Sequence, residues 1–264
     1  MEQKAYIIGE ETVRKYLSLD DVIDICEKTW RWYGEGKVVM PNKITTDMSG
    51  LGVAGWFNSM PAYIAPLDTA GLKLVGGYDG NKALGLPYIK ANVVLTDPRT
   101  GILRALVSGD YINDMRTGAQ PAIMTRMLAS STDVVCIIGT GLMAYYSLLC
   151  MSKTVTIKEV RLCDISEEAK DRFIARFPDA PWKFVKCATN EEGCRGADVV
   201  VTITNANADL VEEPWLKEGS LVMTMGSFRE TSFDVVRKAD KIAVDQVGQS
   251  LHRGNVKELA EMAF

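Results

Sequence analysis

Apolar and polar residues alternate along the first half of the chain in short runs that are separated by turn residues. Runs rich in β-branched and aromatic residues are typical of strands. Four of them are KITTD, VAGWFNSMPAYI, AGLKLVGGY and YIKANVVLTD. The turn Asp97-Pro98-Arg99-Thr100-Gly101 connects the last of these to ILRALVSG, which is a hairpin signature. Consecutive strands with short turns predict a largely antiparallel sheet.

Two helices are predicted in the same half. Ser18-x-x-Asp21 resembles a capping box that opens an amphipathic helix, which ends near residues 34–36. A longer helix is expected over residues 110–129, and its internal proline predicts a kink or an interruption. Because the early helix is expected to pack against the sheet, this half is predicted to be an α+β domain.

From Asp133 onward the pattern changes to alternating strands and helices. The apolar runs VVCIIG, VRLCDI, DVVVTIT and SLVMTMG are typical of strands buried on both faces. Helical stretches lie between them, in GLMAYYSLLCM, SEEAKDRFIARF and a shorter segment around EEGCRG. This alternation predicts an α/β fold, a Rossmann-type doubly wound parallel sheet. We place the boundary near residue 128, between domains of residues 1–128 and 129–264.

Composition narrows the function classes. The 264 residues include 47% hydrophobic and 24% charged residues, and the net charge is −4. An acidic chain without a basic face argues against nucleic acid as a partner and favours small metabolites. The start of the sequence does not read as a signal peptide, and no apolar run approaches the roughly 18 residues of a membrane span. We therefore expect no membrane partner and a cytoplasmic protein.

The six cysteines are scattered, and several lie in apolar runs, so we expect buried, reduced thiols. With His252 as the single histidine, we expect no metal site.

A glycine motif follows the strand at residues 134–138 directly: Gly139-Thr140-Gly141-Leu142-Met143-Ala144. It matches G-x-G-x-x-A between a strand and a helix, which is the context that a dinucleotide-binding loop requires. The first glycine permits the tight turn, and the second lets the backbone approach a pyrophosphate. The alanine allows close packing of helix on strand, while the helix N-terminus supplies N–H donors.

Polar residues after two further strands add to this prediction. Asp164 follows 25 residues after Gly139, where a carboxylate would accept hydrogen bonds from the adenosine ribose. This carboxylate would repel a 2′-phosphate, so NAD is favoured over NADP. The alternative interpretation is that Asp164 caps the next helix. Thr202, Thr204 and Asn205 lie at the end of another strand, at the position of the nicotinamide ribose, or form a turn that needs no ligand.

Several motifs occur along the whole chain in a specific order. They are Met40-Pro41-Asn42-Lys43, Met60-Pro61-Ala62-Tyr63, Gly71-Leu72-Lys73-Leu74-Val75, Met115-Arg116-Thr117-Gly118-Ala119, Gly139-Thr140-Gly141, and Pro214-Trp215-Leu216-Lys217-Glu218-Gly219 leading to Met225-Gly226-Ser227. In this combination the sequence resembles the ornithine cyclodeaminase/mu-crystallin family. The resemblance implies a substrate domain that forms a homodimer through its sheet, joined to a Rossmann domain. It also implies hydride transfer to or from the Cα–N bond of a small amino or imino acid.

Three cations are the candidates for holding the α-carboxylate of such a substrate. Arg116 leads, because a guanidinium can bind a carboxylate bidentately, although a helix-surface arginine is the plain alternative. Lys73 lies in an apolar strand, so it either extends to water or faces a ligand or a buried acid. The family resemblance favours a catalytic and substrate-binding role for both. Lys43 stands where the family often has arginine, and an exposed strand lysine is the alternative.

Some features depart from the family pattern. Family members that cyclise ornithine carry an aspartate as acid/base where this chain has Phe228, although Glu230 or Asp234 could compensate. Met143 replaces a glutamine that is usual in the cofactor loop. The acids at the start of the long helix, Asp110 and Asp114, are interpreted as helix N-terminal charges rather than catalytic groups.

The leading hypothesis is therefore an NAD(H)-dependent dehydrogenase or imine reductase. The alternatives are ornithine cyclodeaminase proper, which uses NAD without net consumption, and a non-catalytic dinucleotide-binding protein similar to the lens member of the family. The substrate is left open, because it depends on the directions of side chains around Trp56, Asn58 and Tyr78.

The sequence ends at VKELAEMAF inside an apparent helix, and family chains usually run further. A frayed terminal helix and a fragment of a longer protein are both consistent with this end.

Overall fold

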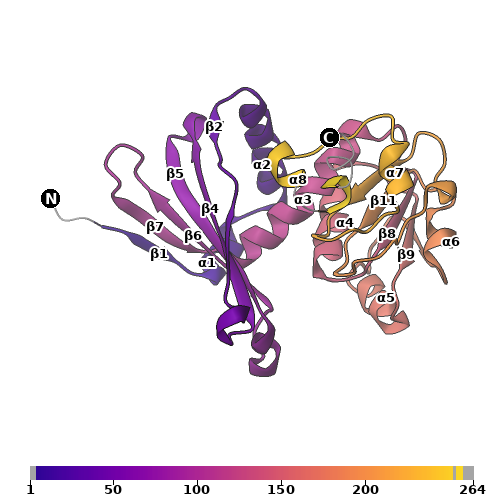
Figure 1. The fold of residues 1–264 in the computed structure, drawn as a ribbon, viewed down its shortest axis with the longest axis horizontal. Coiled ribbons are helices and arrows are strands. Elements are labelled where there is room, and N and C mark those ends of the chain that lie inside the picture. Colours follow the sequence, from indigo (N-terminus) through magenta and orange to yellow (C-terminus); the bar gives the residue numbers. More distant parts are fainter. Residues whose placement is uncertain (1–3, 252–253, 258–264) are drawn as a thin grey trace. The chain divides into compact units, whose positions relative to one another are not determined.

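In the computed structural model, which describes residues 4–251 and 254–257, the chain forms two compact units, Met1–Arg116 and Thr117–Phe264 (Figure 1). The division lies inside helix α3 (Asp110–Leu128), twelve residues before the boundary placed at residue 128 from the sequence. The long helix thus contributes its first two turns to one unit and the remainder to the other. The predicted α/β fold class, with a Rossmann-type domain and an α+β domain, is confirmed.

The N-terminal unit is built on a seven-stranded sheet in the order β1-β7-β6-β5-β4-β2, with β3 paired to β4. The strands are β1 Tyr6–Ile8, β2 Val38–Val39, β3 Ile44–Asp47, β4 Gly55–Ile64, β5 Thr69–Tyr78, β6 Ile89–Thr96 and β7 Leu103–Ser108. The pairings from β2 to β7 are antiparallel, as predicted, and β6 and β7 form the expected hairpin. Strand β1, by contrast, pairs in parallel with β7. The sequence pattern did not predict β1, because the strand has only three residues.

Helices cover one face of this sheet. Val13 of α1 (Glu10–Tyr16) is buried against Ala105 and Val107 of β7, and the first turn of α3 packs on the same cluster. The capping box is also present, since the Ser18 side chain accepts a hydrogen bond from the Asp21 N–H at the start of α2 (Leu19–Gly34).

The opposite face carries a row of apolar residues that are registered across five strands. The row runs Ile7, Leu106, Val94, Leu72, Pro61, each the direct neighbour of the next. Alternation along β7 explains the row, because Ala105 and Val107 point to the helices and Leu106 points away. The two residues at one end of the row, Ile7 and Leu106, are exposed in this chain by 85% and 39%.

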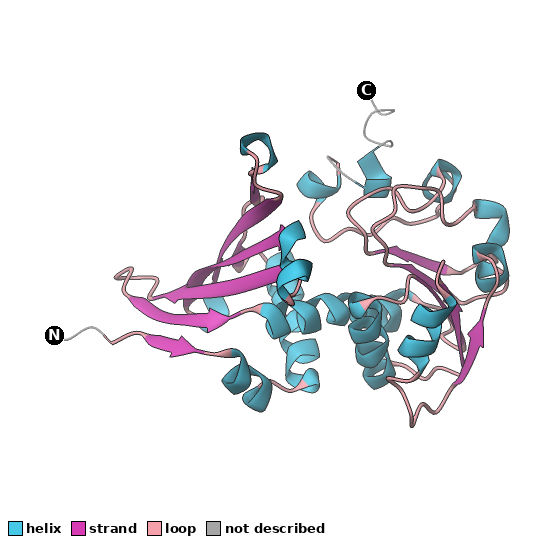
Figure 2. Ribbon diagram, turned by 90° about the horizontal axis from the view of Figure 1, so that it is seen from below, coloured by secondary structure: helices cyan, strands magenta, loops and turns pink. Residues whose placement is uncertain are grey.

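The C-terminal unit is a five-stranded sheet in the order β10-β9-β8-β11-β12, with every pairing parallel. Its strands are β8 Val134–Ile138, β9 Glu159–Cys163, β10 Lys183–Lys186, β11 Val199–Thr202 and β12 Leu221–Thr224. Its further helices are α4 Leu142–Thr154, α5 Glu167–Ile174, α6 Asn190–Cys194, α7 Phe233–Arg237 and α8 Val247–Ser250. Helices lie on both sides of the sheet (Figure 2). The strand order reverses between β8 and β11, which is the switch point where such sheets bind ligands.

Short 3-10 helices occupy some of the connections in both units. They are η1 Ser49–Leu51, η2 Ala65–Leu67, η3 Asp79–Leu84, η4 Glu213–Trp215 and η5 Gly254–Val256.

Four buried cysteines form part of the core of the C-terminal unit: Cys136, Cys163, Cys187 and Cys194. They lie around Gly193, where an added Cβ would approach the Cys163 Sγ to 2.4 Å. None of the six cysteines takes part in a disulfide. Burial within the core, rather than a bond between thiols, accounts for their positions.

Helix α3 continues through Pro121, so of the two predicted outcomes, a kink or an interruption, the interruption is not found. Its C-terminal part contacts α4 closely at Gly118. An added Cβ there would lie 2.5 Å from the carbonyl carbon of Tyr146 and 2.6 Å from its oxygen. These atoms belong to the backbone of α4 and cannot rotate aside, so only glycine allows the two helices to pack at this distance.

Gly118→Ala should therefore destabilise the protein. Alanine normally stabilises a helix by about 1 kcal/mol relative to glycine, but overpacking against a backbone costs about 1–3 kcal/mol. The measurement is the urea midpoint of unfolding. Gly34→Ala in α2, where the added Cβ meets nothing within 4 Å, is the matched control. An unchanged or higher midpoint for the Gly118 variant would contradict the packing described.

Candidate functional site

The glycine loop between β8 and α4 has the geometry that the sequence predicts. Gly139 adopts a φ of +95°, and an added Cβ would lie 2.6 Å from the carbonyl oxygen of Ile203. Glycine is thus required there for conformation and for space. Gly141 is the N-cap of α4, and a Cβ on it would meet nothing within 4 Å, so this backbone borders open space. Ala144 is fully buried, as close packing of helix on strand requires.

Asp164 lies at the end of β9 and is hydrogen-bonded to this loop. Its Oδ2 accepts from the N–H and the hydroxyl of Thr140 at 2.8 and 2.7 Å, and its Oδ1 accepts from the Ser166 N–H. Burial alone would raise the pKa of this carboxyl, but these hydrogen bonds and the charge of Lys170 outweigh it and lower the pKa. The side chain that caps α5 is Ser166, so the alternative role of Asp164 as a helix cap is not found.

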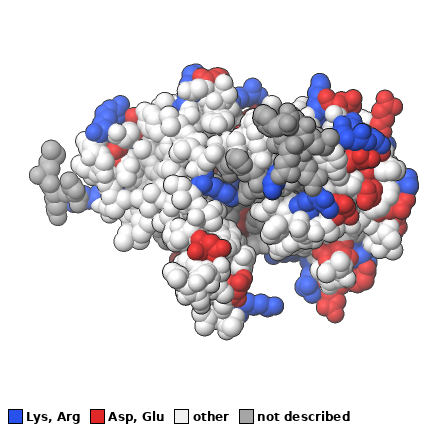
Figure 3. Space-filling view, viewed as in Figure 1, with Lys and Arg blue, Asp and Glu red and all other residues white. Residues whose placement is uncertain are grey.

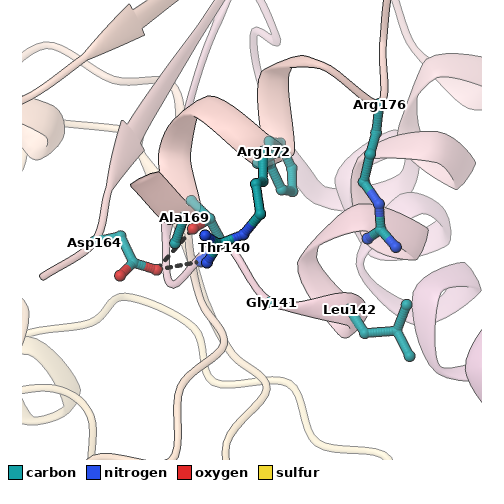
Figure 4. A pocket seen from close by; sticks show the side chains of 8 residues that line it. Thr140, Gly141, Leu142, Asp164, Ala169, Arg172 and Arg176 are labelled. Carbon is teal, nitrogen blue, oxygen red and sulfur yellow. Dashed lines mark hydrogen bonds between the residues drawn. The ribbon is translucent and has the colours of Figure 1, made fainter. Parts of the chain in front are cut away.

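A cavity of about 400 Å³ opens beside the loop and Asp164 (Figure 4). Four of its lining residues were predicted to bind a cofactor: Thr140, Gly141, Leu142 and Asp164. Its other walls come from Ala169, Arg172, Phe173 and Arg176, in or just after α5. Sequence patterning missed the arginines because charges on an amphipathic helix ordinarily form its solvated face. Met143 is half-buried and does not line this cavity.

A buried acid organises the loop after β11. Glu230 is fully buried and accepts from the Thr202 hydroxyl, from the N–H and hydroxyl of Thr204, and from the Gly226 N–H, at 2.7–2.9 Å. Both threonine hydroxyls predicted to serve the cofactor therefore point to Glu230, and Thr202 is fully buried. Asn205 is exposed. Glu230 joins the ends of β11 and β12 and is not placed to act as a base in solvent.

In the N-terminal unit, two of the predicted cations are hydrogen-bonded to the same asparagine. The Oδ1 of Asn113, which is buried in α3, accepts from the Lys73 Nζ at 2.9 Å and from the Arg116 Nη2 at 2.8 Å. Burial, then the charges of Arg116 and Lys43, lower the pKa of Lys73 to about 7. Lys43 thus belongs to the same electrostatic cluster. We call Lys43, Lys73, Asn113 and Arg116 the cation cluster; Asn113 was missed because an isolated asparagine carries no motif.

The other residues that the sequence singled out lie elsewhere or have structural partners. Asp110 accepts from the Ala91 N–H and forms an ion pair with Lys90, which fits a role at the helix N-terminus. Asp114 has a pKa raised to about 6, mainly by burial and then by the nearby charge of Asp110. Phe228 is half-exposed.

Two of the side chains considered for substrate selection have partners within the sheet. Asn58 is buried and accepts from the Thr45 hydroxyl, and Trp56 donates to the Tyr88 hydroxyl. Tyr78, at the end of β5, is partly buried.

Some kinds of site are not found in the part of the chain that the structure describes. No three His, Cys, Asp or Glu side chains within residues 4–251 and 254–257 gather as a metal ion would require. Among those same residues, no helix is both long and apolar enough to cross a bilayer. Lys and Arg are interspersed with Asp and Glu on the face drawn in Figure 3, so that face presents no broad basic surface.

The glycine loop at the switch point of a parallel sheet, with an acid at the end of the second strand, defines a dinucleotide-binding α/β protein. The N-terminal unit adds a partly buried cluster of cations. The chain belongs to the Ornithine cyclodeaminase/mu-crystallin family, whose family model matches residues 3–264. The family resemblance seen in the motifs is thus confirmed. The prediction that the protein is an enzyme of the kind found in this family is confirmed as well.

Two relatives show the range of the family. Alanine dehydrogenase of Archaeoglobus fulgidus is 31% identical over 255 residues, which are 95% of this chain and 76% of that protein. Ketimine reductase mu-crystallin of Mus musculus is 32% identical over 190 residues, which are 70% of this chain and 60% of that protein. The chain thus matches only part of the length of each relative.

Two solved structures match nearly the whole of this chain. An archaeal alanine dehydrogenase dimer with bound NAD has a TM-score of 0.88 at 29% identity, covering 98% of this chain and 80% of that one. The Δ1-pyrroline-2-carboxylate reductase of Thermococcus litoralis, in complex with NADH and L-proline, has a TM-score of 0.85 at 26% identity. That match covers 97% of this chain and 81% of the other.

The lowered pKa of Lys73 can be tested directly. In protein labelled with ¹³Cε-lysine, one lysine resonance should titrate near pH 7 and be absent from Lys73→Arg. Arg116→Gln removes a neighbouring positive charge and should raise this pKa, because less repulsion opposes protonation. Added carboxylate should also raise it, so carboxylate affinity should fall as pH rises above about 7. Titration of all lysine resonances above pH 9 would contradict the cluster.

Proposed function

We propose that the chain is an NAD(H)-dependent oxidoreductase that transfers hydride to or from the Cα–N bond of a small amino or imino acid. The observation that carries the proposal is the cation cluster, in which Lys73 and Arg116 share one amide oxygen. Like charges gathered at a partly buried site favour an anion such as an α-carboxylate. The glycine loop and Asp164 supply the cofactor site in this proposal. Among the structures named above, the archaeal alanine dehydrogenase contains NAD, and the Thermococcus litoralis reductase contains NADH and L-proline.

Each residue has a distinct role in this proposal. Arg116 holds the substrate carboxylate through two N–H groups, with Lys43 adding charge. Lys73 has a pKa of about 7, so at neutral pH it can donate a proton to the imine nitrogen or accept one from the amine. Asn113 positions Lys73 and Arg116 against each other. The bound nicotinamide supplies or accepts the hydride.

The cofactor residues follow from the loop. Gly139, Thr140, Gly141, Leu142 and Met143 present the N-terminus of α4 to the pyrophosphate, and Asp164 accepts from the ribose. Thr202 and Thr204 act through the loop that Glu230 fixes, which places Asn205 at the edge of the site. NAD is the expected cofactor.

Net oxidation or reduction is favoured over redox-neutral cyclodeamination. Family members that cyclise ornithine carry an aspartate as the acid/base at one position. This chain has Phe228 at that position, and phenylalanine has no proton acceptor. Glu230 cannot replace it, because its carboxylate is buried and accepts four hydrogen bonds. Asp234 is engaged by Arg237 and Lys238. A reductase that uses Lys73 for proton transfer needs no acid or base at positions 228, 230 or 234.

The test is oxidation of NADH by the purified protein with a panel of cyclic imino acids and of 2-oxo acids with ammonia. Net consumption is expected for at least one, and Arg116→Ala should lower kcat/KM by about 100-fold, the effect of losing two charged hydrogen bonds. Arg126→Ala, on the last turn of the same helix, is the control. Formation of proline from ornithine without net NADH change would show cyclodeamination instead. NADH binding without any turnover would show a non-catalytic binder.

The apolar row on the open face of the N-terminal sheet supports a homodimer formed through that face. Ile7 and Leu106 are exposed in the single chain, and contiguous apolar surface of this kind marks an interface. The archaeal alanine dehydrogenase structure is a dimer. Two sheets that meet on such rows would bury them from water.

Leu106→Glu should therefore shift the protein from dimer to monomer in light scattering after gel filtration, because each interface would bury two unpaired carboxylates. Ile242→Glu, at another exposed apolar position outside this sheet, should leave the mass unchanged. A wild-type monomer, or a dimeric Leu106 variant, would contradict this interface.

A cytoplasmic location accords with the thiols. All six cysteines are without disulfides, including neighbours such as Cys136 and Cys163, whose sulfurs are 4.0 Å apart. Unlinked cysteines at such separations are typical of a reducing compartment.

A further inference from the structure

Four of the six cysteines meet in the core between α6 and the parallel sheet, and the proposed function uses none of them. Cys136 lies in β8, Cys163 ends β9, Cys187 follows β10 directly, and Cys194 ends α6. Each is 2% exposed or less. An added Cβ on Gly193 of α6 would lie 2.9 Å from the Cys136 Sγ, 3.8 Å from the Cys187 Sγ, and closer still to that of Cys163. We call these four cysteines the thiol cluster, because three of their sulfurs converge on one point.

Cys163 differs chemically from its neighbours. The hydrogen bond with the Cys136 thiol, whose sulfur is 4.0 Å away, is the main cause that lowers the pKa of Cys163. The Cys187 thiol and the charge of Lys170 lower it further and outweigh the effect of burial. The pKa values of Cys136 and Cys187 are raised instead. Cys163 is therefore the thiol that ionises first among these three, and the thiolate is the form that attacks an oxidant.

A buried lysine holds its charge beside this thiol. Lys170 of α5 is 1% exposed, and its Nζ donates to the carbonyl oxygen of Cys187 at 2.9 Å. It also forms an ion pair with Glu167. Because these contacts fix the ammonium group at the end of β10, its charge acts on Cys163 from a defined position.

Strand register identifies the partner with which Cys163 can form a bond. Strands β9 and β10 pair with Leu162 opposite Lys186, and the Cys187 N–H donates to the Leu162 carbonyl at 3.0 Å. Cys187 therefore lies directly opposite Cys163. Neighbouring strands are about 4.8 Å apart, and a disulfide joins residues whose Cα atoms are about 4.4–6.8 Å apart. The backbone thus places Cys163 and Cys187 at a distance that a disulfide can span.

The same criterion excludes Cys136 as that partner, although its sulfur is near. The residue opposite Cys163 on β8 is Ile138, two positions beyond Cys136. Two residues along a strand and one strand across separate the Cα atoms by about 8 Å, beyond the limit of about 7 Å for a disulfide. Cys136 can therefore hydrogen-bond to Cys163 but cannot be linked to it without movement of the backbone.

The end of β9 also supports the glycine loop. The Gly139 N–H donates to the carbonyl oxygen of Cys163 at 2.8 Å, and the next residue, Asp164, accepts two hydrogen bonds from Thr140. A disulfide requires its two sulfurs to approach to about 2.05 Å. Drawing Cys163 toward Cys187 would therefore move the backbone that holds Gly139 and Thr140 in place.

We propose that Cys163 and Cys187 form an oxidative modification site, at which hydrogen peroxide converts the two thiols into a disulfide and thereby weakens dinucleotide binding. The effect on dinucleotide binding rests on the proposed function, whereas formation of the disulfide does not. Peroxide reaches the sulfurs when α6 opens locally, since this helix of five residues is the element that covers them.

The reaction has two steps. The Cys163 thiolate attacks one oxygen of peroxide, which gives a sulfenic acid and a hydroxide ion that takes up the proton released by Cys163. The Cys187 sulfur then displaces the sulfenic oxygen as water and forms the S–S bond. In total, two thiols and one peroxide give one disulfide and two waters, so each sulfur is oxidised by one electron.

The test starts from the reduced full chain, which is treated with hydrogen peroxide, denatured, alkylated and digested. Mass spectrometry should find a peptide pair that links Cys163 to Cys187 and is lighter than the two free peptides by two hydrogens. In a fluorescence titration, the dissociation constant of NADH should rise by about tenfold, the effect of one lost hydrogen bond. Dithiothreitol should restore the original value.

Three variants assign the roles of the sulfurs, each compared with its own untreated sample. Cys187→Ala removes the partner, so no linked peptide should form and dimedone should label the sulfenic acid of Cys163. Cys163→Ala should give neither the link nor the label. Cys150→Ala, at a fully buried cysteine of α4 outside the thiol cluster, is the control and should behave as the wild type.

A redox titration separates a coupled disulfide from one that is merely tolerated. If the disulfide weakens NADH binding tenfold, saturating NADH must stabilise the dithiol by the same factor. The midpoint potential should therefore rise by about 30 mV with NADH, the value of a tenfold change for a two-electron couple. A disulfide without influence on the glycine loop would show the same potential with and without NADH.

Each outcome decides one part of the proposal. Free thiols at Cys163 and Cys187 after peroxide treatment would overturn the modification site, and so would a link from Cys163 to Cys136 or Cys194. A Cys163–Cys187 link with unchanged NADH affinity would overturn the coupling to the glycine loop. A reduced protein that binds no NADH would overturn the proposed function, while the linked peptide would still support the modification site.

Discussion

The passage from β8 to α4 depends on a contact that leaves no room for a side chain. Gly139 turns with a positive φ while the carbonyl oxygen of Ile203, from the loop after β11, lies where a Cβ would be. Because parallel strands end at one edge of the sheet, the loops after β8, β9 and β11 converge there. The open backbone at Gly141, the Asp164 carboxylate and the cavity beside them all follow from this convergence.

Two acids hold the converging loops, in different ways. Asp164 is partly exposed. Its carboxylate is hydrogen-bonded to the glycine loop, and the residue also lines the cavity. Glu230 is fully buried and satisfies four donors from the ends of β11 and β12. A buried carboxylate is tolerated only when it is hydrogen-bonded in this manner. Asp164 therefore still borders the cavity, whereas Glu230 fixes the loop residues around it and does not face the cavity.

The N-terminal unit brings positively charged side chains together. Burial, and then the charges of Arg116 and Lys43, oppose protonation of Lys73, which shares one amide oxygen with Arg116. An anionic substrate would relieve this repulsion, so the same arrangement that lowers the pKa of Lys73 favours carboxylate binding. In the proposed mechanism, substrate affinity and proton transfer would therefore be coupled through the Lys73 side chain.

The sequence by itself determined the two kinds of sheet, the glycine loop and its acid, and the three cations, because these depend on local patterns and short motifs. It could not indicate the positions of Asn113, Glu230 or the arginines in and after α5, since a lone asparagine, a buried acid and surface-like charges carry no periodic signal. Nor could it show that α3 runs through Pro121 without an interruption. Only tertiary structure decided these points: it brings residues distant in sequence within hydrogen-bonding distance, and their surroundings then set burial, charge and pKa.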